Sequence, residues 1–286
     1  MTDIKQLELK AVDVRIDIME MVSKGKGSAH PAPSLSCADI LTVLYYNIMN
    51  VRPDEPDWPD RDRLILSKGH ACPALYSVLE NKGYFPREEI YSLRGCRSIL
   101  QGHPDMKKTP GVDMTSGSLG HGLAAGVGMA IGLRLRKSLA NVYVILGDGE
   151  IQEGVVWEAA MSASKYRLSN LIAVLDYNHL QSSGFVEDNM PIEPVADKWR
   201  AFGFKVLEVN GHDIQALIQT FELAKTIKGG PVLIIAHTTK GKDVSYMENN
   251  PIWHSRLPSN EEYRQAIREL EAKRARLEWE AAGARR

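Results

Sequence analysis

The amino-acid sequence predicts an α/β fold in which a mostly parallel sheet is covered by helices on both faces. Short apolar runs alternate with longer segments of helical periodicity, which is the pattern of strands joined by crossover helices. Two of these runs, 142–146 and 171–175, lead directly into polar and glycine residues that suit a binding loop. With 286 residues, of which 44% are hydrophobic, the chain has enough apolar material for one large domain or two small ones.

The predicted strands are short apolar runs, most of which end near Gly, Asp or Asn. They are 64–67, 142–146, 171–175, 205–209 and 232–237. The predicted helices are longer segments with helical composition or periodicity. They are 11–23, 37–48, 74–82, 122–137, 153–166, 195–201 and 214–227. Asn210-Gly211 is a turn dipeptide after the fourth strand, and Asp213 is placed to cap the helix that follows.

The end of the chain differs in composition from the rest. Residues 259–286 open with Ser-Asn-Glu-Glu and intersperse Glu, Lys and Arg, which predicts a solvated helix that frays over 281–286. We therefore divide the chain into a main domain, 1–258, and a charged C-terminal helical tail, 259–286. Within the main domain, 107–114 and 240–250 are predicted loops at the functional edge of the sheet.

Charge and cysteine content exclude several classes of protein. The formal net charge of -1 gives no reason to expect nucleic acid or an anionic membrane as a partner. No apolar run has the length of a membrane span, and the N-terminus lacks a signal-peptide core, so we expect a cytoplasmic protein. Cys37, Cys72 and Cys96 have neither the number nor the spacing of a disulfide framework or a zinc site.

Gly147-Asp148-Gly149 and Asn178 carry the chemistry that the sequence predicts. The two glycines allow a sharp turn that brings N–H groups close to a phosphate, while Asp148 supplies an anionic oxygen. Asn178 follows the next strand and adds a neutral oxygen, and oxygen ligands suit Mg²⁺, which takes further ligands from substrate phosphates and water. The tripeptide alone is more often an ordinary turn, and it is the second strand with its Asn that favours the metal site.

Five further blocks extend this pattern into a resemblance. Residues 147–178 resemble the thiamine diphosphate motif, and Gly-Asp-Gly-Glu-Ile-Gln-Glu-Gly at 147–154 resembles the transketolase family in particular. The same family order is followed by Ala29-His30-Pro31, Ser67-Lys68-Gly69-His70, Gln101-Gly102-His103-Pro104, Gly117-Ser118-Leu119-Gly120-His121-Gly122 and Trp253-His254-Ser255. A dinucleotide fingerprint at Gly120-x-Gly122 is a poor alternative, because no convincing strand precedes it.

Family transketolases are much longer than this chain. The resemblance therefore implies the N-terminal, diphosphate-binding subunit of a split transketolase, in which 1–258 is the diphosphate-type domain. A C-terminal transketolase subunit would supply the pyrimidine-binding domain and the activating glutamate, and an α2β2 heterotetramer is expected. The alternatives are a truncated inactive homologue, a regulatory cofactor-binding subunit, deoxyxylulose phosphate synthase and the α-subunit of a 2-oxoacid dehydrogenase. The Ser-Lys-Gly-His block speaks against the synthase, and the histidines speak against the dehydrogenase.

The resemblance also assigns residues. The expected cofactors are thiamine diphosphate and Mg²⁺, or Ca²⁺ or Mn²⁺ in its place, with Asp148, Asn178 and the main-chain carbonyl of Leu180 as metal ligands. The catalytic histidines implied are His30 and His103 near substrate oxygens, and His70 and His254 near the diphosphate and the reacting carbon. The residues implied beside the cofactor are His70, Gly117, Leu119, Asp148, Gly149, Glu153, Asn178 and His254, of which Glu153 also resembles an acid that contacts a neighbouring subunit. An exposed helix-start acid is an equal alternative for Glu153.

The implied reaction is transfer of a two-carbon ketol unit from a ketose phosphate to an aldose phosphate. Imidazole suits it, because it donates or accepts a proton near neutral pH. Residues that read sugar length and phosphate are expected largely in the partner subunit, so pentose phosphates are a family default. One departure is Ala29-His30-Pro31-Ala32, where many family members have glycines on both sides of His-Pro, and a second is Tyr177 in place of Asn. His121, His212 and His237 are expected to be structural.

Overall fold

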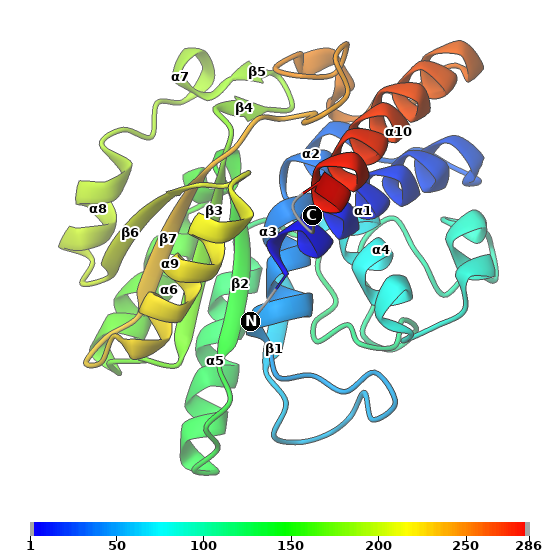
Figure 1. Cartoon of the computed structure of the whole chain (residues 1–286). Coiled ribbons are helices and arrows are strands. Elements are labelled where there is room, and N and C mark those ends of the chain that lie inside the picture. The colour runs from blue at the N-terminus through cyan, green and yellow to red at the C-terminus, as the bar shows by residue number, and fades with distance from the viewer. Residues whose placement is uncertain (1–2, 284–286) are drawn as a thin grey trace.

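The computed structural model describes residues 3–283 and is built on a parallel sheet of five strands in the order β1-β2-β3-β7-β6 (Figure 1). The strands are β1 (Arg63–Leu66), β2 (Val142–Gly147), β3 (Leu171–Tyr177), β6 (Lys205–Asn210) and β7 (Val232–His237). Every pairing among them is parallel. A small antiparallel hairpin, β4 (Leu180–Gln181) with β5 (Gly184–Phe185), follows β3 and was not predicted. The predicted α/β class with a mostly parallel sheet is confirmed.

Each strand contributes side chains to two hydrophobic layers, because successive side chains of a strand point to opposite faces of the sheet. Along β2, Tyr143 and Ile145 are buried in one layer, whereas Val142, Val144 and Leu146 are buried in the other. The first layer is covered by α1 (Ile4–Lys24), α2 (Pro31–Ser36), α3 (Ala38–Val43), α4 (Cys72–Lys82), α9 (Ile214–Thr226) and α10 (Asn260–Gly283). The second layer is covered by α5 (His121–Leu135), α6 (Gly154–Lys165) and α8 (Val195–Ala201). The remaining short elements are α7 (Val186–Asn189), a π-helical turn η1 (Leu44–Ile48), and the 3₁₀ turns η2 (Gly69–Ala71), η3 (Arg87–Ser92), η4 (Gly149–Gln152) and η5 (Pro251–His254).

Local signals explain most helix ends. The carboxylate of Asp213 accepts a hydrogen bond from the Ala216 N–H, so the predicted cap of α9 is confirmed. α5 stops at Leu135, before the predicted end, and Lys137 has a positive φ of 58°. The helix predicted over 37–48 is confirmed from Ala38 onward, with its last five residues, Leu44–Ile48, in the π-helical turn η1, but the helix α2 before it was not predicted. Helical structure begins at Pro31, where proline is tolerated in a first turn, and is interrupted at Cys37, whose ψ is 8°.

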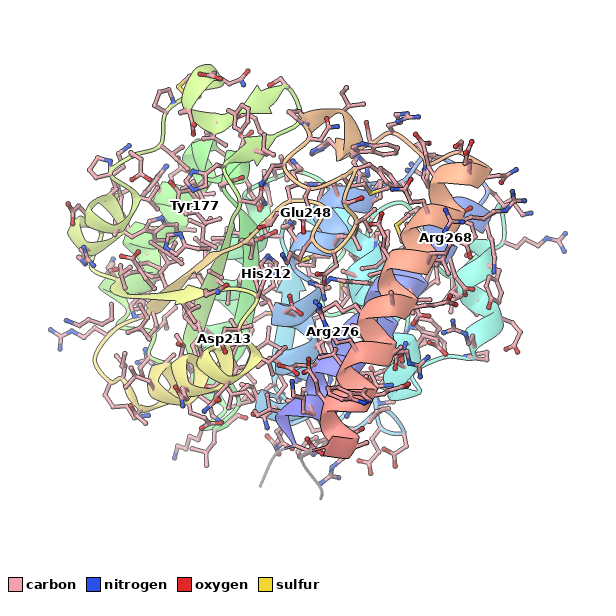
Figure 2. The ribbon with its side chains drawn as sticks, turned by 45° about the horizontal axis from the view of Figure 1, so that its top comes forward. Tyr177, His212, Asp213, Glu248, Arg268 and Arg276 are labelled. Carbon is pink, nitrogen blue, oxygen red and sulfur yellow. The ribbon has the colours of Figure 1, made fainter. Side chains whose placement is uncertain are left out.

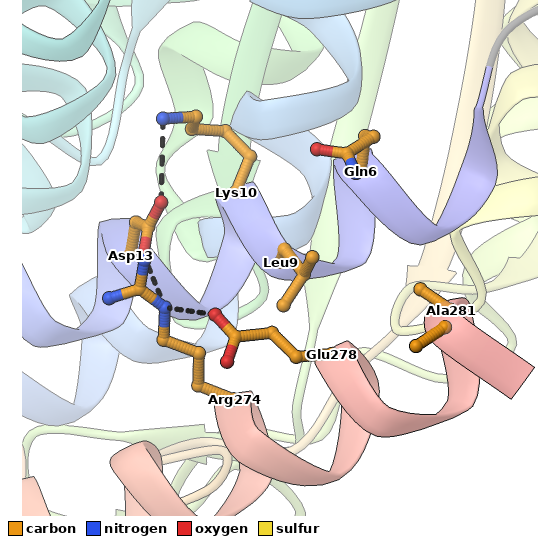
Figure 3. A pocket seen from close by; sticks show the side chains of 8 residues that line it. Gln6, Leu9, Lys10, Asp13, Arg274, Glu278 and Ala281 are labelled. Atoms are coloured by element: carbon orange, nitrogen blue, oxygen red, sulfur yellow. Dashed lines mark ion pairs between the residues drawn. The ribbon is translucent and has the colours of Figure 1, made fainter.

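The C-terminal helix α10 is less solvated than predicted. Ala266, Leu270 and Leu277 are buried, because their spacing places them on one stripe that packs beside α1. At the rim of this contact, Arg274 Nε lies 3.7 Å from Asp13 on α1 and 3.3 Å from Glu278 (Figure 3). The predicted fraying over 281–286 does not begin at 281, since α10 continues to Gly283, and 284–286 lie outside the described residues. The division of the chain after residue 258 stays a prediction.

Within residues 3–283, no helix combines the length and the hydropathy that crossing a membrane requires.

Candidate active site

The carboxyl ends of neighbouring strands bring the predicted site together. β2 and β3 run in register so that Gly147 lies beside Asp176, and the chain then continues into Asp148 and Asn178 respectively. β1 leads into Lys68 on one side, and β7 leads into Lys240 on the other. Parallel strands with crossover helices place all these ends at one edge of the sheet, where open α/β folds bind ligands.

A cavity of about 360 Å³ opens at this edge. Every residue that the sequence predicted for the site lines it, namely His30, His70, His103, Gly117, Leu119, Asp148, Gly149, Glu153, Asn178, Leu180 and His254. Gly147, to which the sequence assigned a turn, also lines the cavity, and the remaining lining residues, to which the sequence assigned no role, are Pro33, Lys68, Glu150, Gln152, Gln181, Ser182 and Lys240. Their roles in binding and catalysis stay predictions, but their convergence on one cavity is a property of the fold.

The carboxylate of Asp148 is buried and oriented by the backbone. Oδ1 accepts a hydrogen bond of 2.8 Å from the Gly149 N–H, and Oδ2 accepts one of 2.9 Å from the Asn178 N–H. No ion-pair partner of Asp148 is found within residues 3–283. Burial raises the pKa of this carboxyl to about 6, against its ordinary value of 3.8.

Two further oxygen donors, the Asn178 side chain and the Leu180 carbonyl, lie directly after β3. Asn178 Oδ1 accepts a hydrogen bond of 3.1 Å from the Leu180 N–H, which holds 178–180 in a tight turn. The Leu180 carbonyl accepts a hydrogen bond of 2.7 Å from Lys240 Nζ. A carbonyl oxygen has two lone pairs, so this bond leaves one available for a second partner. The carboxylate, the carboxamide and the carbonyl are all hard oxygen donors of the kind that Mg²⁺, Ca²⁺ and Mn²⁺ prefer.

Lys240 is a buried cation with no carboxylate partner in the described part of the chain. Nζ donates to Leu180 and lies 3.0 Å from His254 Nδ1, which places the proton of the neutral His254 ring on Nε2. Burial lowers the pKa of Lys240 to about 8. The loop that carries Lys240 is anchored by His212, whose Nε2 accepts a hydrogen bond of 2.8 Å from the Thr239 N–H. His212 lies between the sheet and the α1–α10 pair (Figure 2) and contacts Asp39 through Nδ1.

These buried charges test whether a metal diphosphate fits the cavity. Asp148 and Lys240 are an anion and a cation buried without ion-pair partners, and an unpaired buried charge costs several kcal/mol. A divalent cation would compensate Asp148, and a diphosphate would compensate Lys240. The residues present therefore fit a metal diphosphate, with Asp148, Asn178 and Leu180 toward the metal and Lys240 toward the phosphates.

Lys68, in contrast, is already neutralised. Its ammonium forms an ion pair with the fully buried Asp176 and donates to the Pro33 carbonyl at 2.9 Å. Asp176 also accepts hydrogen bonds from Ser36 and Thr238. Although burial works in the opposite direction, Lys68 and these donors hold the pKa of Asp176 below its ordinary value. The pair fixes the end of β3 at Asp176, two residues before Asn178.

Glu150 is the third residue, after Lys240 and Lys68, whose role the sequence reasoning missed. Its buried carboxylate accepts hydrogen bonds from Ser67 Oγ, from the Gly120 N–H at 2.7 Å and from the Gly147 N–H at 2.9 Å. It thereby ties the ends of β1 and β2 to the loop that carries Leu119. Lys68 and Glu150 both lie inside the family motif blocks, and that position in the sequence could have indicated a role at the site. Nothing in the local sequence marks Lys240.

Three of the four predicted histidines form a cluster of contacting rings. The ring centroids of His30 and His70 are 5.1 Å apart, those of His70 and His254 are 5.1 Å apart, and those of His30 and His254 are 5.4 Å apart. Burial is the main cause that lowers the pKa of His30 to about 4 and that of His254 to about 3. Burial also lowers the pKa of His70 and His103. All four rings are thus neutral at pH 7 and present one donor and one acceptor nitrogen each.

The other predicted residues have simpler surroundings. Gly117, Leu119 and Gly149 form cavity wall, and Glu153 is exposed at its edge, directly before α6. His179 packs on the Tyr177 ring, with centroids 4.2 Å apart, and does not line the cavity.

Comparison with known proteins agrees with this geometry. The family model described as transketolase, thiamine diphosphate binding domain, matches residues 7–275. One of the subunits of apulose-4-phosphate transketolase from Phocaeicola vulgatus is 44% identical over 280 residues, which covers 98% of this chain and 99% of that protein. A 6-deoxy-6-sulfo-D-fructose transketolase subunit from Clostridium sp. is 43% identical over 265 residues, covering 93% and 96% respectively. The solved transketolase from Campylobacter jejuni matches with a TM-score of 0.84 and 31% identity over 97% of this chain and 48% of that one. The chain therefore belongs to the transketolase family, as a counterpart of its thiamine diphosphate-binding domain.

Proposed function

We propose that this chain is the N-terminal subunit of a split transketolase. It would transfer a two-carbon ketol unit from an anionic ketose to an aldose phosphate, using thiamine diphosphate and Mg²⁺. The observation that carries the proposal is the convergence of the predicted oxygen ligands and histidines on one cavity at the carboxyl edge of the sheet. The near full-length match to proteins named as transketolase subunits supports the split arrangement.

The residues of this chain divide into two groups with different tasks. Asp148, Asn178 and the Leu180 carbonyl would hold the metal, while Lys240 would neutralise part of the diphosphate charge. When bound, thiamine diphosphate supplies the carbon nucleophile that breaks and makes the carbon–carbon bond of the sugar. The protein's share of the work is binding, orientation and proton handling.

The histidine cluster would manage the protons of the sugar. Because burial keeps His30, His70 and His254 neutral at pH 7, each ring can accept a proton from a substrate hydroxyl or donate one to a carbonyl oxygen. Lys240 donates to Nδ1 of His254 and so directs the Nε2–H of that ring to other acceptors. His103 would add a further contact to substrate oxygens.

The partner would complete the site. We infer a C-terminal transketolase subunit that supplies the pyrimidine-binding domain and the activating glutamate, in a cytoplasmic α2β2 heterotetramer. Glu153, exposed at the cavity edge, would face a neighbouring subunit.

The names of the relatives bear on the identity of the sugar. The two relatives are named for apulose 4-phosphate and for 6-deoxy-6-sulfo-D-fructose, which favours an anionic ketose other than xylulose 5-phosphate as a second candidate. A non-catalytic, regulatory cofactor-binding subunit is the alternative from another functional class.

Ketol transfer to an aldose phosphate tests the proposal. The chain is assayed alone and with the protein encoded beside its gene, in the presence of thiamine diphosphate and Mg²⁺, with xylulose 5-phosphate, apulose 4-phosphate and 6-deoxy-6-sulfofructose as donors. We expect activity only in the mixture, and loss of that activity in Asp148→Ala. Cofactor binding without transfer from any donor would favour the regulatory alternative.

A further inference from the structure

The loop after β7 holds Lys240 on a backbone that contacts fix from several sides. The Lys240 carbonyl accepts a hydrogen bond of 2.9 Å from the Asn249 N–H, and the Gly241 N–H donates to the Ala32 carbonyl at 3.1 Å. Gly241 and Asp243 have positive φ values of 81° and 70°. A left-handed conformation at a residue other than glycine persists only where the surroundings impose it, so the contacts of Asp243 help to define this loop.

A buried arginine joins this loop to two helices. Arg15 on α1 is fully buried, and its guanidinium donates to Asp39 on α3 through Nη1 at 2.9 Å and through Nη2 at 2.6 Å. Its Nε lies 3.1 Å from the carboxylate of Asp243, which also accepts a hydrogen bond of 2.6 Å from Lys273 on α10. A guanidinium is planar and rigid, so Arg15 fixes the distance between Asp39 and the far end of the loop.

His212 completes the connection on the other side of Lys240. Although burial acts in the opposite direction, Arg15 and His212 hold the pKa of Asp39 below its ordinary value, so this group is a carboxylate at pH 7 and only accepts hydrogen bonds. The His212 Nδ1, 2.7 Å from Asp39 Oδ2, therefore carries a proton, and Nε2 accepts a hydrogen bond of 2.8 Å from the Thr239 N–H. One neutral tautomer of the ring satisfies both contacts and ties Asp39 to the residue directly before Lys240.

The contacts of Lys240 in the cavity depend on where this loop lies. Nζ donates to the Leu180 carbonyl at 2.7 Å and lies 3.0 Å from His254 Nδ1. A lysine side chain is a flexible four-carbon stem, so a shift of the backbone would let the ammonium leave both partners. His212 restrains that backbone at the Thr239 N–H. The His212 side chain is 14% exposed and does not line the cavity, so its effect there passes through Lys240.

We propose that His212, oriented by Asp39 and Arg15, is a positioning residue that sets the place of the Lys240 ammonium in the cavity. The inference rests on the proposed function and deepens it, because it names residues outside the cavity that prepare the diphosphate end of the site. It gives His212 a role in cofactor binding, whereas the sequence had indicated a structural residue. A loop that is fixed before the ligand arrives reduces the ordering that binding requires.

A double-mutant cycle in the two-subunit complex separates the positioning of Lys240 from general support of the fold. His212→Phe keeps a ring but removes both nitrogens, and its affinity for thiamine diphosphate with Mg²⁺ is measured by calorimetric titration. We expect binding to weaken about 3- to 10-fold, the range for one lost hydrogen bond. In the background of Lys240→Met, the same change should weaken binding by less than about 2-fold, because no ammonium is left to position. His237→Phe, the same replacement at an exposed histidine that ends β7, should leave the affinity unchanged.

His212→Gln provides a milder form of the same cycle and replaces His212→Phe if the latter does not fold. A carboxamide offers one donor and one acceptor, so His212→Gln should bind the cofactor more weakly than the wild type but more tightly than His212→Phe. Hydrogen exchange of the backbone amides over 239–243, measured by mass spectrometry on the cofactor-free complex, should be faster in His212→Phe than in the wild type.

An equal loss of affinity in the presence and in the absence of the Lys240 ammonium would overturn the inference, because His212 would then act on the site by another route. An unchanged affinity in the His212 variants would overturn it as well, whether or not amide exchange over 239–243 becomes faster. Failure of the wild-type complex to bind thiamine diphosphate, or binding that Lys240→Met leaves unchanged, would instead count against the proposed function.

Discussion

Replacing Asp176 with Asn removes the counter-charge of a lysine that is enclosed in the protein. Lys68 and Asp176 are 2% and 0% exposed, and their ion pair joins the ends of β1 and β3. Breaking a buried pair from one side costs about 3–5 kcal/mol, because the remaining charge is left without compensation. That is a large share of the roughly 5–15 kcal/mol by which a domain is stable. We expect Asp176→Asn and Lys68→Met each to lower the free energy of unfolding by about this amount.

The double variant separates the pair from its surroundings. Once either partner is gone, removing the second strands no further charge, so Lys68→Met with Asp176→Asn should cost about as much as one single change. Chemical denaturation of the four proteins at pH 7 gives the coupling energy, which we expect to exceed about 2 kcal/mol. Simple additivity of the two single changes would refute the idea that each charge exists to neutralise the other.

The stability that Asp176→Asn loses relative to the wild type depends on pH in a defined direction. The pKa of Asp176 is lowered in the folded protein, so its contribution to stability is present above its ordinary pKa of 3.8 and is lost as the pH falls below that value. The difference in unfolding free energy between wild type and Asp176→Asn should therefore be constant from pH 6 to 8 and shrink in acid. Urea denaturation at a series of pH values measures it.

Three further predictions concern the metal, the diphosphate and the packing. Asp148→Asn should abolish Mg²⁺-dependent binding of thiamine diphosphate, measured by calorimetry. The cofactor-free variant should be at least as stable as the wild type at pH 8, because the change removes a carboxylate whose pKa is raised to about 6 by burial. A clearly less stable variant would contradict this. Lys240→Met should weaken diphosphate binding about 10- to 100-fold. The affinity of the wild type for the diphosphate should decline above pH 8, where Lys240 loses its charge, whereas the affinity of Lys240→Arg should not. Gly122→Ala should lower the melting temperature, since its β-carbon would lie 2.8 Å from Ser67 Cα. Gly128→Ala, whose β-carbon would have no heavy atom within 4 Å, should raise the free energy of unfolding by up to about 1 kcal/mol. Equal effects of the two changes would refute the packing argument.

The strands and the carboxyl edge could be predicted because they depend on neighbouring residues. An apolar run that ends in Gly147-Asp148-Gly149 reports both a buried strand and the loop after it, and the same holds for the run before Asn178. Periodicity failed where it was incomplete. It missed the short helix α2, which the break at Cys37 separates from the predicted helix over 37–48, and it missed the hairpin β4–β5, whose strands are only two residues long.

The sequence by itself determined the fold class, the family resemblance and the set of residues that meet at the sheet edge, since each rests on short-range patterns in the chain. Only the tertiary structure decided which charges are compensated. Lys68 finds Asp176 across 108 positions, whereas Asp148 and Lys240 find no ion-pair partner among the described residues. Pairing depends on distances between segments that are remote in the chain and on the water that burial removes, and neither is encoded in local spacing. For the same reason, the burial of Ala266, Leu270 and Leu277 on α10 could be recognised only from the tertiary structure, in which α1 lies beside that helix.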